Sequence, residues 1–209
     1  KRQAYLTAYV SLVRRGNLTK GEALLVHGST GGVGMAAVQL GKYLGATVIA
    51  TGTSEEKLEF TKKWGADHTL LTHKDNIVDF RDEVKDITNG KGADVIYDPV
   101  GGDVFDHSIR CINWGGRLLV VGFASGRIPN LPINMALIKG FSVIGVRAGE
   151  YGRKDPKAGI ENNNAIRKIC EEGHFSPYTC KEFDLKEAKD AIKFLSERKL
   201  VGKVIIKTN

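Results

Sequence analysis

A doubly wound α/β fold, built on a parallel six-stranded sheet, is predicted by three features of the 209-residue sequence. Short apolar segments recur along the chain, and segments with helical spacing lie between them. A glycine-rich run at residues 27–34 follows the first apolar segment and precedes a helix-like segment of small residues. Continuous apolar strands that alternate with helices indicate a parallel sheet covered on both faces.

The predicted strands share a run of Val, Ile, Leu or Ala bounded by polar residues or glycine. They lie at residues 23–26, 47–51, 68–71, 94–97, 118–121 and 142–146. Six such strands match the dinucleotide-binding arrangement in which ligands lie at the carboxyl ends of the strands.

The predicted helices carry apolar side chains every three or four residues. Ser54 can cap one of them, because Glu55 and Glu56 follow it in the first turn. The others are expected at residues 35–44, around Ile77, Phe80, Val84 and Ile87 with Gly90 as the stop, and around Phe105, Ile109 and Ile112.

The C-terminal part of the sequence has a different pattern. A helix is predicted over 160–173, a polar stretch runs through Pro177, and a helix at 186–198 precedes a last strand at 203–207. We therefore expect a dinucleotide-binding Rossmann domain over 1–173 and a distinct C-terminal segment over 174–209.

The composition excludes few classes of protein. The net charge of +7 and the pI of about 9.3 are compatible with nucleic acid or with anionic phosphate ligands. The basic residues are dispersed, however, which favours a solvated basic surface over a nucleic-acid site. No apolar run approaches the roughly 18 residues of a membrane span. The three scattered cysteines fit a reducing compartment, so a cytoplasmic location is expected, with a mitochondrial one left open.

The glycine-rich run carries the main functional signal. The window Ser29-Thr30-Gly31-Gly32-Val33-Gly34 matches G-x-G-x-x-G except at its first position, where Ser29 replaces glycine. Such a turn lets backbone N–H groups approach a pyrophosphate at a helix N-terminus. Alone, it does not distinguish a nucleotide-binding turn from an ordinary strand–helix connection.

Several motifs, taken in order and spacing, resemble the cofactor-binding part of the medium-chain dehydrogenase/reductase superfamily. Within it, the chain is most similar to the zinc-independent quinone oxidoreductase (zeta-crystallin-like) group. The motifs are Tyr5-Leu6-Thr7-Ala8-Tyr9, Gly31-Gly32-Val33-Gly34, Leu44-Gly45-Ala46, Asp98-Pro99-Val100-Gly101-Gly102, Gly115-Gly116-Arg117, Val121-Gly122-Phe123 and Gly202-Lys203.

This resemblance implies an NADPH-dependent reductase that transfers hydride to a quinone or an α,β-unsaturated carbonyl. It also implies an additional N-terminal β domain, so that this chain would be a fragment that is inactive alone and its tail would return to that domain. No catalytic residue can be named. A zinc-dependent alcohol dehydrogenase and a non-enzymatic nucleotide- or RNA-binding module stay open. Relatives of this group pair through the last strand, which predicts a homodimer through residues 141–146.

The choice of nicotinamide cofactor is predicted from the end of the second strand. NAD-specific relatives place an acidic residue there, and this sequence has Gly52. Ser54 and Lys57 follow, and the resemblance adds His73 as a contact for the 2′-phosphate. NADPH is therefore favoured, although Glu55 and Glu56 keep NAD open. Helix capping by Ser54, a solvated Lys57 and a surface His73 are the alternatives.

The remaining expected cofactor contacts come from strand ends. The glycine-rich turn is expected to contribute Ser29, Thr30, Gly31, Gly32 and Val33. The ribose side of the cofactor is expected to contact Thr53, Ser54, Lys57 and His73. By resemblance, the nicotinamide side involves Val100, Gly122, Phe123, Ala124 and Val146, and Lys203 approaches from the tail. The five histidines are scattered without the spacing of a metal site, so no metal ligand is predicted.

Overall fold

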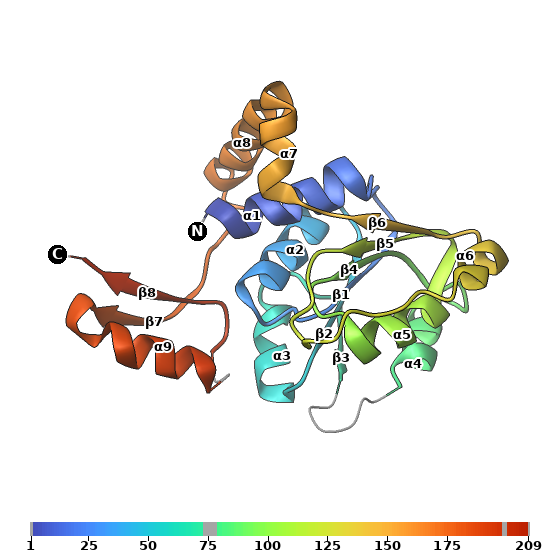
Figure 1. Cartoon of the computed structure of the whole chain (residues 1–209), viewed down its shortest axis with the longest axis horizontal. Coiled ribbons are helices and arrows are strands. Elements are labelled where there is room, and N and C mark those ends of the chain that lie inside the picture. The colour runs from blue at the N-terminus through green and yellow to red at the C-terminus, as the bar shows by residue number, and fades with distance from the viewer. Residues whose placement is uncertain (1, 73–78, 198–199, 209) are drawn as a thin grey trace.

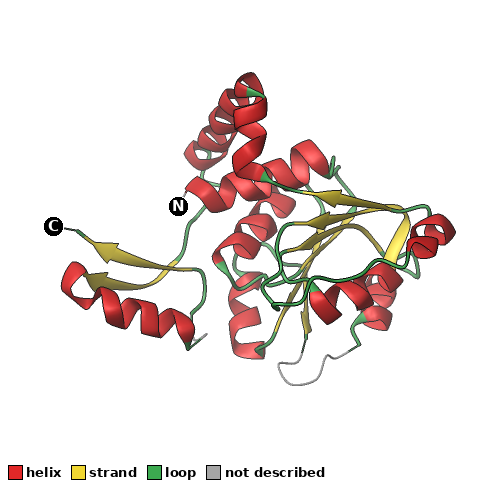
Figure 2. Ribbon diagram, in the orientation of Figure 1, coloured by secondary structure: helices red, strands yellow, loops and turns green. Residues whose placement is uncertain are grey.

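The computed structural model describes residues 2–72, 79–197 and 200–208. Its body is a six-stranded sheet of order β3-β2-β1-β4-β5-β6, in which all neighbouring strands are parallel (Figures 1 and 2). This is the doubly wound order predicted from the sequence. The strands are β1 Ala23–Val26, β2 Thr47–Gly52, β3 His68–Leu71, β4 Ala93–Asp98, β5 Ile112–Val120 and β6 Ser142–Gly145.

Helices cover both faces of this sheet, as the ribbon views show (Figure 2). The body contains α1 Arg2–Tyr9, the π-helix η1 Val10–Arg15, α2 Gly32–Tyr43, α3 Glu55–Lys62, α4 Arg81–Ile87, α5 Gly102–Cys111, α6 Ile133–Lys139, α7 Ala148–Lys154 and α8 Pro156–Glu171. The tail contains β7 Thr179–Asp184, the 3₁₀-helix η2 Leu185–Glu187, α9 Ala188–Ser196 and β8 Lys203–Lys207.

The core has two layers because successive strand residues point to opposite faces of the sheet. Leu24 and Val26 pack with α1, α2 and α8 on one face. Leu25 packs with α4 and α5 on the other face. All three side chains are fully buried, which explains why the strands read as uninterrupted apolar runs rather than as alternating ones.

The structure moves several predicted boundaries; the helix predicted over 160–173, for example, is α8 and spans Pro156–Glu171. Ile112 was predicted on a helix face, but its backbone is extended (φ −75°, ψ 142°) and it begins β5. The pairing of β4 with β5 then shifts register between Ala93 and Val95, so the strand starts six residues before the predicted position. The α4 helix begins at Arg81, and Ile77 lies outside the described residues.

The tail forms a small unit of its own. Its strands β7 and β8 pair in parallel, and α9 lies against them. In Figure 1 this unit projects from the body, at the left, and is connected through the segment between α8 and β7. Among the described residues, no helix combines the length and the apolar character that a membrane crossing requires.

Candidate functional site

The loops after the strands meet at one edge of the sheet, because the strands are parallel. The chain runs outward from β1 to β3 and then crosses back to β4, so β1 and β4 are neighbours at the point where the strand order reverses. Crevices at such a point are where open α/β sheets bind ligands. The predicted site residues that the structure describes lie in these loops, in the first turns of the helices that follow them, or in the tail beside them.

The glycine turn brings α2 close to the end of β1. Gly28 has φ +57°, and a β-carbon on Gly34 would lie 2.3 Å from the Gly28 carbonyl oxygen. Only glycine fits at position 34 without movement of the backbone. The first N–H groups of α2 have no acceptor four residues earlier in the helix, so this turn presents donors and a positive dipole end to an anion.

The tail places a cation over this helix end. The Gly202 N–H donates to the Thr30 carbonyl at 2.8 Å, and Gly202 forms a parallel bridge with Gly31. A β-carbon on Gly32 would lie 3.0 Å from Cγ and Cε of Lys203 and 3.2 Å from its Nζ. In the described part of the chain, no group accepts a hydrogen bond from this ammonium. A cation at a helix N-terminus is unfavourable unless an anion lies between them.

The end of β2 is shaped by a helix cap. The Ser54 hydroxyl accepts a hydrogen bond from the Lys57 N–H at 3.4 Å, so Ser54 is the N-cap of α3. Thr53 is exposed and the Lys57 side chain is half-buried. A β-carbon on Gly52 would lie 3.1 Å from Leu58 Cδ2 and 3.5 Å from Thr30 Cγ2. His73 lies outside the described residues.

Ser29 has a structural contact. Its hydroxyl donates to the Thr51 carbonyl at 2.9 Å, and its N–H donates to the same oxygen at 3.0 Å. The residue is fully buried. Ser29 therefore ties the glycine turn to the end of β2, which explains the departure from glycine at this position of the motif.

A buried histidine, which sequence reasoning treated as ordinary, connects three elements beneath the turn. His27 Nδ1 lies 2.8 Å from Thr51 Oγ1, and Nε2 lies 2.8 Å from Ser108 Oγ. Ser108 donates its own proton to the Val104 carbonyl, so Nε2 carries the ring proton and Nδ1 accepts from Thr51. Burial lowers the pKa of His27 to about 3, and the ring stays neutral.

The loop after β4 is folded around a buried carboxylate. Asp98 accepts hydrogen bonds from the N–H groups of Val100 and Gly101, both at 2.8 Å. Burial raises the pKa of Asp98 above its ordinary value. A β-carbon on Gly28 would lie 3.4 Å from Val100 Cγ2. The structure therefore brings Val100 against the glycine turn.

The loop after β5 lies over the loop after β4. The Ala124 N–H donates to the Pro99 carbonyl at 3.1 Å, and the Gly122 N–H donates to the Asp98 carbonyl at 3.3 Å. The Phe123 ring reaches toward Gly101 and is 42% exposed. Val146 lies after β6, where its N–H donates to the Val120 carbonyl. The predicted nicotinamide-side residues of the β4 and β5 loops thus form one group, with Val146 one strand away.

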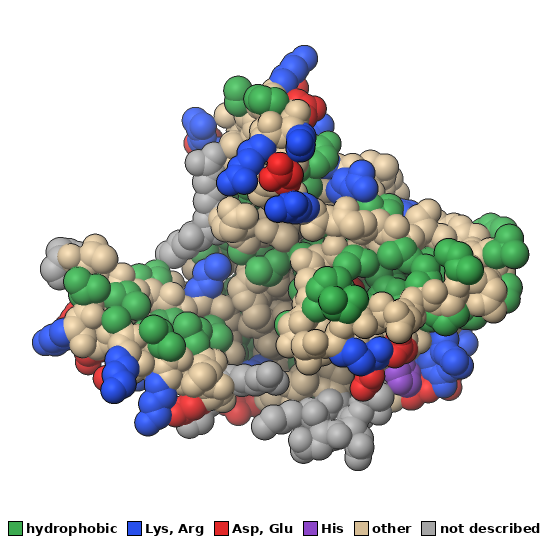
Figure 3. Space-filling view, in the orientation of Figure 1, with side chains coloured by type: hydrophobic (Ala, Val, Ile, Leu, Met, Phe, Trp, Pro, Cys, Tyr) green, Lys and Arg blue, Asp and Glu red, His purple; other side chains and the backbone are tan. Residues whose placement is uncertain are grey.

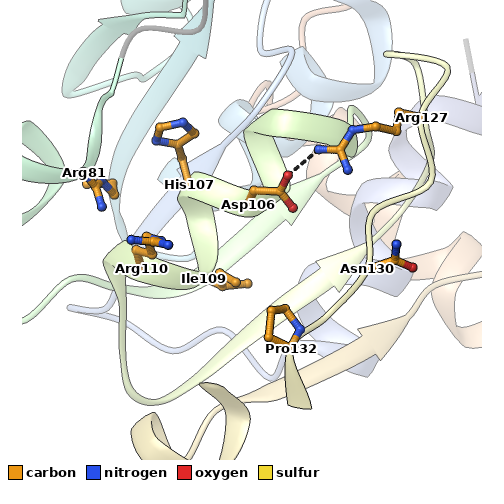
Figure 4. A pocket seen from close by; sticks show the side chains of 8 residues that line it. All are labelled: Arg81, Asp106, His107, Ile109, Arg110, Arg127, Asn130 and Pro132. Atoms are coloured by element: carbon orange, nitrogen blue, oxygen red, sulfur yellow. Dashed lines mark hydrogen bonds and ion pairs between the residues drawn. The ribbon is translucent and has the colours of Figure 1, made fainter. Parts of the chain in front are cut away.

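A separate surface pocket of about 500 Å³ lies along the outer side of α5. Figure 4 shows its lining side chains, including Arg81, His107 and Arg127, with an ion pair between Arg127 and Asp106. Arg81 pairs with Asp79, so much of the positive charge is compensated. Within the described ranges, no three His, Cys, Asp or Glu side chains come together as a metal site.

Comparison with known proteins gives a consistent result. Residues 32–162 match the sequence model of the family described as zinc-binding dehydrogenase. The chain is 35% identical over 206 residues to a quinone oxidoreductase-like protein 2 homolog of Nematostella vectensis, covering 98% of this chain and 56% of that protein. It is 30% identical to a 2-haloacrylate reductase of a Burkholderia species, covering 96% of this chain and 60% of that protein.

A solved structure supports the same assignment of the fold. A mycobacterial protein complexed with NADPH superimposes with a TM-score of 0.88 at 26% identity, over 98% of this chain and 62% of that chain. The chain spans little more than half the length of the two curated relatives named above.

Proposed function

Because the chain belongs to the zinc-binding dehydrogenase family, as the cofactor-binding part of a quinone oxidoreductase-like medium-chain dehydrogenase/reductase, we propose that it binds NADPH. In the whole protein, hydride passes from this cofactor to a quinone or an α,β-unsaturated carbonyl. Residues 1–173 would form the dinucleotide-binding domain and residues 174–209 the segment that returns to the substrate domain. A zinc-dependent alcohol dehydrogenase of the same superfamily and a non-enzymatic RNA-binding module are the alternatives.

The observation that carries the proposal is the Lys203 ammonium over the first residue of α2. A helix N-terminus and a lysine both attract anions, and together they fit a pyrophosphate. The backbone at Thr30, Gly32 and Val33 would hold the phosphates, with Lys203 on the other side. The nearby Gly31 allows close approach because it carries no side chain.

The preference for NADPH rests on the end of β2. An acidic side chain at Gly52 would repel a 2′-phosphate, and this chain has none there. Thr53, Ser54 and Lys57 surround the position, and His73 is proposed to join them. A charge-assisted hydrogen bond from Lys57 would contribute about 1.5–3 kcal/mol, which is roughly ten- to hundred-fold in affinity.

Calorimetric titration of the chain with NADPH and NADH tests this proposal. NADPH should bind more tightly, and Lys57→Ala should weaken NADPH while leaving NADH almost unchanged. Tighter binding of NADH to the wild type would overturn the choice of cofactor. No measurable binding of either nucleotide would overturn the proposed function as a whole.

When bound, the nicotinamide would supply the hydride for the reduction. The chain's own part is to orient that ring: the loop residues Val100, Gly122, Phe123 and Ala124 would lie along it, and Val146 would bound its far end. The acceptor class is supported by two of the relatives, a quinone oxidoreductase-like protein and a 2-haloacrylate reductase. Because the substrate wall lies in the rest of the protein, the chain alone should bind cofactor without turning over quinone.

We also propose that the activity is zinc-independent and that the protein is a homodimer. The support for the dimer is β6, which ends the sheet and exposes Val143. Beside it, the outer side of α6 exposes Ile133 (75%) and Leu137 (83%). Metal analysis of the full-length protein tests the first proposal: activity that depends on bound zinc would overturn it.

A further inference from the structure

One aromatic side chain of the tail packs against α3 and against Gly202, which itself lies beside Met35 of α2. The Tyr178 ring lies 5.2 Å from Trp64, just after α3, and 6.2 Å from Phe60 within α3. On its other side it packs on Gly202: a β-carbon there would lie 3.1 Å from Tyr178 Cδ1 and 3.2 Å from Met35 Cε. Gly202 has φ +74°, so glycine is required at this position both for its backbone conformation and for space.

Gly202 links Tyr178 to the phosphate end of the site through a hydrogen bond and through its neighbour in the sequence. Gly202 donates to Thr30 in the glycine turn, and the next residue, Lys203, lies over Gly32. Thr179, which follows Tyr178, is the strand partner of Lys203 in the β7–β8 pair. Tyr178 therefore supports Lys203 from both directions along the tail, through Gly202 and through Thr179.

The other tail contacts hold a different part of the tail. Gln39 exchanges two hydrogen bonds with the Ser176 backbone, each of 3.0 Å, and Tyr5 packs on Phe175 at 4.3 Å. They fix where the tail leaves the body. They do not determine how β8 returns to the glycine turn, because β7 and α9 project from the body between these points (Figure 1).

We propose that Tyr178, held between α3 and Gly202, is a positioning residue that sets the affinity of the site for the diphosphate of a nicotinamide dinucleotide, by keeping the Lys203 ammonium over the N-terminus of α2. This inference rests on the proposed function for the identity of the ligand. Lys203 is the group that meets the anion, and Tyr178 acts only through it.

Removal of the ring should therefore release β8 and lower affinity only while Lys203 is present. The test is a double-mutant cycle with Tyr178→Leu, Lys203→Met and the double variant, titrated with NADPH and with inorganic pyrophosphate. Lys203→Met should weaken NADPH by about tenfold or more, the effect of one lost charge-assisted bond. Tyr178→Leu should weaken both probes several-fold in the wild type and leave the Lys203→Met background unchanged.

Two further variants serve as controls. Tyr178→Phe keeps the ring and should bind as the wild type does. Tyr43→Leu removes another ring contact with the tail, to His174 at 4.8 Å. Tyr43 is the last residue of α2, about 16 Å along the helix from Gly32, so its loss should leave affinity unchanged. If Tyr178→Leu fails to fold, Trp64→Leu removes the same contact from the other side.

The outcomes separate the two proposals. Wild-type protein that binds neither probe refutes the proposed function. If Lys203→Met weakens binding, and Tyr178→Leu lowers affinity by the same factor with and without Lys203, the positioning role of Tyr178 is refuted and the proposed function is not. An unchanged affinity in Tyr178→Leu also refutes the positioning role. A loss of affinity that occurs only while Lys203 is present supports it.

Discussion

Gly52 separates the effect of charge from the effect of size at the ribose end of the site. Its β-carbon would press on Leu58 at 3.1 Å, so any side chain requires Leu58 to move slightly. Gly52→Ala should lower affinity for NADPH and NADH equally, because it adds volume without charge. Gly52→Asp should in addition repel the 2′-phosphate and offer NADH an acceptor, so the preference should fall or invert.

Titration of both nucleotides with the wild type and the two Gly52 variants measures this difference. The ratio of the two dissociation constants is the decisive quantity, because changes in the shape of the site affect both nucleotides. If Gly52→Asp and Gly52→Ala had the same ratio, the residue would not take part in the choice of cofactor.

His27 makes the stability of the fold depend on pH. Its pKa is about 3 in the folded protein and 6.5 in an exposed imidazole. Below pH 6.5 the unfolded chain takes up a proton that the folded chain does not, so the free energy of unfolding falls by roughly 1.4 kcal/mol per pH unit. This loss continues down to the folded pKa, and above pH 6.5 the stability contributed by the neutral ring is fully present.

Urea unfolding of the wild type and of His27→Gln at several pH values between 7 and 4 tests the histidine. The variant is expected to be less stable at pH 7, since it loses the fit to Thr51 and Ser108. Its disadvantage should shrink as the pH falls, because glutamine does not titrate. A constant difference between the two proteins across this range would mean that His27 titrates normally in the folded state.

At the scale of elements, the sequence predicted the six strands of the large sheet and missed features that depend on distant contacts, among them the tail strand β7. The strands could be predicted because Leu24, Leu25 and their counterparts are buried on both faces of the sheet. Ile112 could not be placed, because it continues the helical spacing of Phe105 and Ile109 and only the backbone of the folded chain separates it from α5. The α6 helix has no buried residue, so it has no core-facing pattern to recognise.

The same distinction applies to the candidate site. The glycine turn and the Ser54 cap are local features and are visible in the sequence. The approach of Lys203 to Gly32 brings together residues that are far apart in the sequence. Only the family resemblance indicated that Lys203 lies near the cofactor. The bonds of His27 and Ser29 are also non-local, and neither residue type carries a signal for them.

The junction of β1 and α2 can be tested through its closest contact. Gly34→Ala would place a methyl group 2.3 Å from the Gly28 carbonyl oxygen, so the turn must shift. We expect a loss of about 1–3 kcal/mol in stability and a clear loss of NADPH affinity. This would occur although alanine favours helix by about 1 kcal/mol over glycine.

Gly41→Ala, in the same helix, is the matched control. Its added methyl group would meet the Leu24 side chain at 2.4 Å, far from the glycine turn. Both variants should melt at lower temperature, and only Gly34→Ala should bind NADPH more weakly. Equal affinities for the two folded variants would contradict the role assigned to the turn.

At the scale of the whole molecule, the exposed apolar surface around α6 and β6 predicts self-association. Figure 3 shows hydrophobic side chains gathered over this end of the body, and Trp114, 75% exposed, lies against Gly140 at the end of α6. An edge strand with an apolar flank is suited to pairing with a second copy. The wild type should therefore be a dimer at micromolar concentration in light scattering.

Leu137→Lys together with Val143→Lys should yield a monomer, because the buried charges would oppose association. Ile160→Lys adds a lysine to α8, at another exposed apolar position, and should remain dimeric. A monomeric wild type would count against a dimer through β6. The same mass for the wild type, the Leu137→Lys/Val143→Lys variant and Ile160→Lys would also count against it.

The hydrogen bond from Gly202 to Thr30 also has a consequence for the order in which the protein is made. Every strand of the large sheet precedes the tail in the sequence, so the body is synthesised before the segment that contains Gly202. The glycine turn therefore receives this hydrogen bond only after the tail has been made. The sheet can fold before the phosphate site is complete, and dinucleotide binding would follow the folding of the sheet.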